Sequence, residues 1–89
     1  MQFEGRNYVD GQWQATELMY SKINPATGKV LGAFPLSGPT EVGAAIDSAR
    51  RAFKKWRKVS RFVRSDYMYK VAQIIERRRE ELATVISLE

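Results

Sequence analysis

Cysteine and histidine, which most often supply nucleophiles, general bases and metal ligands, are both absent from this 89-residue sequence. Their absence excludes a disulfide framework, a thiol nucleophile and a histidine general base. A zinc site would need its ligands from carboxylates alone, which is not the ligand set that zinc prefers. Acid–base chemistry would therefore have to come from ten carboxylates, four tyrosines and the lysines.

Two tyrosines and two carboxylates in the second half of the chain come nearest to a catalytic set. They are Asp66, Tyr67, Tyr69 and Glu76. No spacing brings all four to one face of a helix, and Tyr69 projects away from the apolar stripe described below. Asp66 suits the first turn of a helix, where a negative charge is favourable. We therefore interpret these four residues as structural.

Basic residues are concentrated on one side of the predicted first helix, and the chain carries a net charge of +5. Such a face could contact phosphates of a nucleic acid or, with Phe53 and Trp56 opposite, lie on a membrane surface. A solvated helix face explains the pattern equally well. No helix-turn-helix spacing or motif of stacking aromatic residues supports binding to nucleic acid. The residues concerned are Arg50, Lys54, Arg57, Lys58 and Arg61.

Residues 1–38 read as two β-hairpins. The first has strands 7–9 and 12–14 around Asp10-Gly11, a dipeptide that favours a two-residue turn because both positions take positive φ. The second has strands 20–23 and 29–35 around Asn-Pro-Ala-Thr-Gly, in which Pro25 and Gly28 preset turn dihedrals.

Residues 39–89 read as two amphipathic helices. Pro39 and Glu41 suit the first turn of the first helix, and apolar residues then recur at helical spacing. Ser60 is the expected cap of the second helix, which runs from about Arg61 toward Glu89 with a kink or break expected near residues 77–79. Its stripe comprises Met68, Val71, Ala72, Ile75, Leu82 and Ile86.

Two features of these helices point to contacts beyond the chain. Arg64 and Arg79 project onto the apolar stripe of the second helix, and we expect Arg64 to pair with a carboxylate in a complete fold. Each helix also presents more apolar surface than the other elements would cover. We therefore expect a partner, either more chain or another subunit.

The remaining sequence signals bear on location and on aromatic residues. No run of 18 apolar residues occurs, and residues 1–5 show neither a basic start nor an apolar signal region, so we expect a cytoplasmic location and no membrane partner. Trp13 and Trp56 are interpreted as packing residues rather than ligand platforms.

Four colinear segments carry a family resemblance. Residues 7–13, Asn-Tyr-Val-Asp-Gly-Gln-Trp, resemble the opening hairpin of the aldehyde dehydrogenase superfamily, and residues 23–30, Ile-Asn-Pro-Ala-Thr-Gly-Lys-Val, are similar to its second hairpin. Residues 41–56 resemble its first helix, and Arg64 through Ala83 its second. Leu-Glu at positions 88–89 matches two residues that the family places before a Thr-Gly-Lys. The resemblance covers essentially the whole chain.

The resemblance implies an NAD(P)-dependent parent enzyme that oxidises an aldehyde to a carboxylic acid. The family uses a cysteine nucleophile, a glutamate-activated water and a Rossmann-like cofactor domain. The matched segment precedes all of these, so no catalytic, cofactor-binding or metal-binding residue is carried over. Residues 28–32 read as a turn and strand rather than a phosphate loop. Some family members bind a monovalent cation partly through carbonyls that would fall at Lys22 and Ile23, but the site would be incomplete here.

The sequence thus predicts an α+β unit of two hairpins and two long helices, forming a single partial domain of an α/β aldehyde dehydrogenase fold. Its expected role is that of an amino-terminal structural segment that is inactive alone and binds no cofactor. NAD or NADP is expected to bind to the complete parent enzyme. The expected partner is the remainder of that fold, or a second copy through the apolar helix faces. The alternative is a small basic module that binds nucleic acid or a protein.

Overall fold

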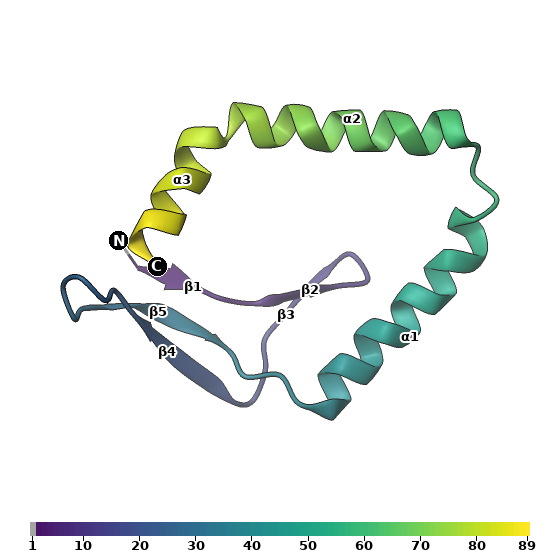
Figure 1. Ribbon diagram of the computed structural model, residues 1–89. Coiled ribbons are helices and arrows are strands. Elements are labelled where there is room, and N and C mark those ends of the chain that lie inside the picture. Colours follow the sequence, from purple (N-terminus) through teal and green to yellow (C-terminus); the bar gives the residue numbers. More distant parts are fainter. Residues whose placement is uncertain (1) are drawn as a thin grey trace.

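The computed structural model describes residues 2–89 as an open ring of helices and small sheets. The three helices follow one another along an arc, and the two sheets close the opposite side (Figure 1). The last helix ends beside the first strand, so the two ends of the chain lie close together (Figure 1). The secondary structure is α+β, as predicted.

The first hairpin forms as the sequence predicts. Strands β2 (Asn7–Val9) and β3 (Gln12–Gln14) pair antiparallel, with Tyr8 opposite Trp13. Asp10 and Gly11 have φ values of 54° and 72°, as a turn of this hand requires. The rings of Tyr8 and Trp13 lie 4.8 Å apart between centroids, which stabilises a ribbon too short to stand alone.

The second hairpin supplies two of the three strands of a larger sheet. Strands β4 (Met19–Ile23) and β5 (Val30–Pro35) pair antiparallel, and β1 (Phe3–Glu4) adds to β5 in parallel, in the order β1-β5-β4. The turn is closed by Asn24, whose side-chain oxygen accepts from Ala26 N–H at 2.9 Å. Gly28 takes φ of +72°.

Strand β1 was not predicted, and Gly32 explains how it fits. A Cβ on Gly32 would collide with the carbonyl of Phe3, so only glycine lets the two backbones approach here.

Helix α1 (Pro39–Trp56) begins where Gly38 ends the loop from β5. The Glu41 carboxylate accepts a hydrogen bond from Gly38 N–H at 2.9 Å, and Pro39 occupies the first helical position. The predicted start of this helix is therefore confirmed.

The second predicted helix is divided in two. Helix α2 (Arg61–Arg77) is capped by Ser60, whose hydroxyl accepts from Val63 N–H at 3.2 Å. Arg78 departs from helical geometry with φ −98° and ψ 15°, and α3 (Arg79–Leu88) follows at a changed direction (Figure 1). The break falls within the predicted segment 77–79.

The ring has little interior. Among residues 2–89, Leu31 is the one hydrophobic residue with a buried side chain, at 6% exposed. The radius of gyration is 16.7 Å, against about 12 Å for a compact domain of this length. The helices do not pack side by side over the sheets.

Candidate functional site

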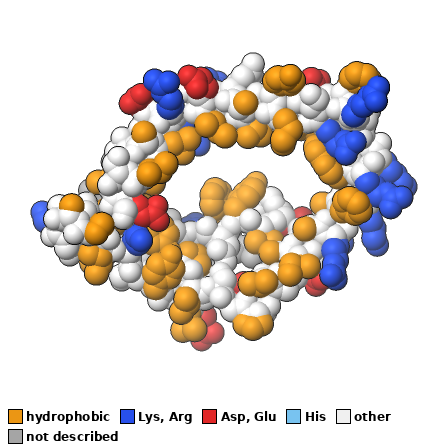
Figure 2. All heavy atoms as spheres, in the orientation of Figure 1, with side chains coloured by type: hydrophobic (Ala, Val, Ile, Leu, Met, Phe, Trp, Pro, Cys, Tyr) orange, Lys and Arg blue, Asp and Glu red, His pale blue; other side chains and the backbone are white. Residues whose placement is uncertain are grey.

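The most extended surface feature is an apolar face that lines the inside of the ring, called the inner face below. It combines the stripes of α1 and α2, and Figure 2 shows hydrophobic side chains along the inner edge of α2 and on the elements opposite. The opening of the ring is visible between them (Figure 2). We define the inner face by the residues that helical periodicity places on these two stripes: Val42, Ala45, Ile46, Ala49, Phe53, Trp56, Met68, Val71, Ala72 and Ile75.

Large inner-face side chains remain half exposed. Ile46 is 48% exposed, Phe53 58% and Ile75 54%. On both helices, the exposed apolar side chains lie on the stripe that helical periodicity defines. Exposed apolar stripes of this kind are typical of surfaces that contact another protein segment.

The total accessible surface is larger than a compact monomer of this mass would expose. The accessible surface is 7820 Å². A folded monomer of 10.2 kDa is expected to expose about 5,300 Å², so the excess is about 2,500 Å². A standard protein–protein interface covers about 800 Å² on each partner. The excess is thus larger than one such interface and approaches the scale of a divided domain core.

One aromatic contact joins α1 to α2 at the corner of the ring. The ring centroids of Trp56 and Tyr67 lie 5.5 Å apart, with an interplanar angle of 52°. Trp56 therefore acts as a packing aromatic, as the sequence indicated.

Arg64 lies three residues before Tyr67, one helical turn closer to this corner. It is half-buried, and its Nε is closed off from solvent without a hydrogen-bond partner among residues 2–89. Its expected carboxylate partner is not supplied by the described part of the chain.

The four residues considered for acid–base chemistry are not brought together. Asp66, Tyr67, Tyr69 and Glu76 are all exposed, and no hydrogen bond or ion pair described for residues 2–89 joins any two of them. Glu76 instead lies 3.8 Å from an Arg79 guanidinium nitrogen. One part of the interpretation was wrong: the first turn of α2 holds no acidic residue, and Asp66 is the sixth residue of this helix.

The basic residues lie on the outside of the ring. Figure 2 shows Lys and Arg side chains gathered around the end of α1 and the start of α2, away from the opening. Arg50, Lys54, Arg57 and Lys58 are exposed, as a solvated helix face would be. The neighbouring Arg51 reaches Asp10 of the first hairpin at 3.9 Å, a weak surface pair.

An ion pair spans the junction of α2 and α3. Arg78 donates to the Glu81 carboxylate through Nε at 2.9 Å and through Nη2 at 2.6 Å. These hydrogen bonds, aided by the charge of Arg78, lower the pKa of Glu81, and the same contact raises the pKa of Arg78. The pair links the residue at the break to the first turn of α3.

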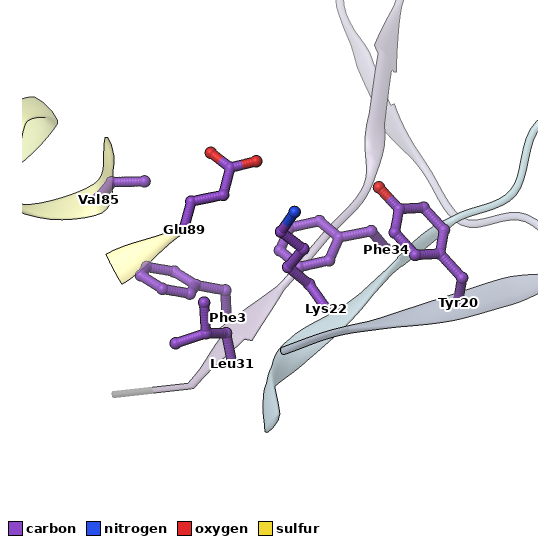
Figure 3. A pocket seen from close by; sticks show the side chains of 7 residues that line it. All are labelled: Phe3, Tyr20, Lys22, Leu31, Phe34, Val85 and Glu89. Atoms are coloured by element: carbon purple, nitrogen blue, oxygen red, sulfur yellow. The ribbon is translucent and has the colours of Figure 1, made fainter. Parts of the chain in front are cut away.

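A pocket of about 120 Å³ lies where the end of α3 meets the three-stranded sheet. Figure 3 shows Lys22 and Glu89 facing the space between Val85 on one side and the sheet aromatics Tyr20 and Phe34 on the other. Its lining is mainly apolar and also includes Phe3 and Leu31. No sequence pattern indicated this pocket, because its walls come from opposite ends of the chain.

Lys22 and Ile23, the positions considered for a cation, lie on β4. The pairing with β5 shifts register between them, as at a β-bulge. Within residues 2–89, no three His, Cys, Asp or Glu side chains gather in a way that could hold a metal ion. Residues 28–32 form the turn and start of β5, in agreement with the reading of that stretch as turn and strand.

Comparison with known proteins identifies the family. The model of the aldehyde dehydrogenase family matches residues 13–89. The chain is 37% identical over 86 residues to malonate-semialdehyde dehydrogenase 1 of Shouchella clausii, covering 94% of this chain and 18% of that protein. It is 37% identical over 81 residues to D-glyceraldehyde dehydrogenase (NADP(+)) of Picrophilus torridus, covering 89% of this chain and 16% of that one.

The chain belongs to the aldehyde dehydrogenase family. It spans less than a fifth of the length of the curated relatives it matches, as a structural segment of such an enzyme would. The alternative of a small basic binding module gains no support from these comparisons. Among residues 2–89, no helix is both long and apolar enough to cross a membrane.

Proposed function

We propose that this chain serves as an amino-terminal scaffold segment of an NAD(P)-dependent aldehyde dehydrogenase, and that the remainder of the fold covers its inner face. The observation that carries the proposal is the excess surface of about 2,500 Å² in a chain of this family. An excess of this size suits an element whose apolar surface is covered by the rest of a larger core.

The parent reaction is the oxidation of an aldehyde to a carboxylic acid with NAD or NADP as hydride acceptor. The aldehyde dehydrogenase family typically uses these cofactors, and one relative carries NADP(+) in its name. The chain has no cysteine, so it cannot supply the thiol nucleophile that the family resemblance implies. We propose that the segment binds no cofactor and that its contribution is to shape and support the parts that do.

The relatives' names concern different aldehydes, malonate semialdehyde and D-glyceraldehyde. The segment is not proposed to select between them. A cytoplasmic location belongs to the same proposal, and fractionation of cells that make the parent enzyme would test it.

Two measurements test the proposed function. The pure 89-residue chain, incubated with malonate semialdehyde or D-glyceraldehyde and NAD or NADP, should give no reduced cofactor above the background without aldehyde. Grafted into a relative in place of the residues it matches, the chain should support folding and activity. Reduction of cofactor by the isolated chain would overturn the scaffold role, as would a grafted enzyme that does not fold.

A further inference from the structure

Arg64 is a charged residue within the stripe that otherwise forms the inner face. At about 100° per residue, it lies within about 40° of Met68, Val71 and Ile75 around α2. Its Nε is buried and lacks a hydrogen-bond partner among residues 2–89. A buried donor without an acceptor destabilises a fold, and such groups are rare in complete structures.

The described chain offers no counter-ion at this place. The arginines in its ion pairs are Arg6, Arg51, Arg78 and Arg79. The two carboxylates on α2, Asp66 and Glu76, lie about 160° and about 120° around the helix from Arg64. Neither can turn toward the inner face while α2 stays helical.

We propose that the element covering the inner face in the complete enzyme brings an Asp or Glu carboxylate to Arg64. This inference rests on the proposed function, because it names the chemistry of the partner that the scaffold segment requires. An apolar partner alone would enclose the guanidinium without compensation, which is strongly unfavourable. A backbone carbonyl would satisfy Nε but leave the charge unpaired, whereas a carboxylate matches both the charge and the planar donors of arginine.

The same charge argues against a second copy of this chain as the occupant. In a symmetric dimer, the same surface patch of each copy forms the contact. Each inner face would contribute another Arg64 and no acidic side chain, since its other members are apolar. Two like charges would then be enclosed together, so the partner has to differ from this chain.

The test uses complete enzymes into which the chain is grafted. The chain replaces the 86 matching residues in malonate-semialdehyde dehydrogenase 1 of Shouchella clausii and, separately, the 81 matching residues in the Picrophilus torridus relative. Each graft is made with the wild-type chain and with Arg64→Met, Arg64→Lys and Arg77→Met. Arg77 is the control, because it is an α2 arginine that is exposed and lies about 140° from Arg64 around the helix.

Thermal unfolding of the grafts gives the main readout. Arg64→Met should lower the unfolding midpoint by about 3 °C or more, because it leaves the partner carboxylate buried without its cation. Arg64→Lys should recover part of the loss, and Arg77→Met should shift the midpoint by less than about 1 °C. In the isolated 89-residue chain, Arg64→Met should leave the helicity unchanged or raise it, since there it removes an unpartnered donor.

The outcomes separate this inference from the proposed function. If the wild-type grafts fold and are active but Arg64→Met and Arg77→Met unfold alike in both, the carboxylate partner is refuted while the scaffold role stands. If Arg64→Met does not fold, recovery of folding by Arg64→Lys supports the ion pair, and equal failure of the lysine variant overturns it. Failure of the wild-type grafts overturns both proposals.

Discussion

Replacing Ile75 by alanine should have a different effect in the isolated chain and in a complete enzyme. Full burial of an isoleucine side chain stabilises a fold by about 1.5–3 kcal/mol. Ile75 remains 54% exposed in the isolated chain. Its side chain therefore contributes less than half of that stabilisation, about 1 kcal/mol. Alanine also favours the helix by a few tenths of a kcal/mol, about 0.3–0.5. The net loss in the isolated chain should therefore stay below about 1 kcal/mol.

In the complete enzyme, the same substitution removes a side chain that we propose to be fully enclosed. A buried Ile→Ala replacement costs about 2–5 kcal/mol, because it adds a cavity to the lost transfer energy. The loss in a grafted enzyme should accordingly be at least twice that in the isolated chain.

Urea unfolding followed by circular dichroism at 222 nm measures both losses. Tyr69→Ala is the matched control: Tyr69 is 69% exposed and lies away from the inner face on the same helix, so its replacement should change stability by less than about 0.5 kcal/mol in either context. The reasoning is refuted if Ile75→Ala costs the isolated chain more than about 2 kcal/mol, because Ile75 would then already belong to a closed core.

Three further changes probe the local structure of the isolated chain. Because Arg78 lowers the pKa of Glu81, the pair should stabilise α3 above the ordinary carboxylate pKa, and this stabilisation should be lost as the pH falls through the lowered pKa. A pH titration of helicity should show this loss, and Arg78→Met should abolish the pH dependence. Ser60→Ala should destabilise α2 by about 1 kcal/mol and lower the helicity measured by circular dichroism, whereas Ser60→Asp should preserve the cap; equal helicity in all three proteins would contradict the capping bond. Gly43→Ala should stabilise α1 by about 0.5–1 kcal/mol, since a Cβ there meets nothing within 4 Å, and a fall in the melting temperature would count against the described environment.

Local elements were predictable from the sequence because short-range physics determines them. The Asp10-Gly11 turn, the start of α1 at Pro39 and the Ser60 cap each depend on residues within four positions of one another. The break at Arg78 was also indicated, because a charged run interrupts the apolar stripe there.

Long-range features were not predictable to the same degree. Strand β1 pairs Phe3 with Gly32 across most of the first half of the chain, and two residues give no periodic signal. The pocket between Phe3 and Val85 joins the two ends of the chain and was missed for the same reason.

The inner face lies between these cases. Its helix stripes and the position of Arg64 on one of them follow from helical periodicity. That the Nε of Arg64 is buried without a hydrogen-bond partner among residues 2–89 does not follow from periodicity. The sequence thus predicted both a partner for the helix faces and a carboxylate for Arg64, and the structure adds that the Nε of Arg64 is buried without an acceptor among residues 2–89.

Amide hydrogen exchange on the isolated 89-residue chain, with light scattering to report its association state, tests the central claim most directly. If the inner face lacks its partner, amides throughout α1 and α2 should exchange rapidly, or the chain should form soluble aggregates through that face. Slow exchange across both helices in a well-defined monomer or dimer would contradict the account, because the chain would then close a core of its own.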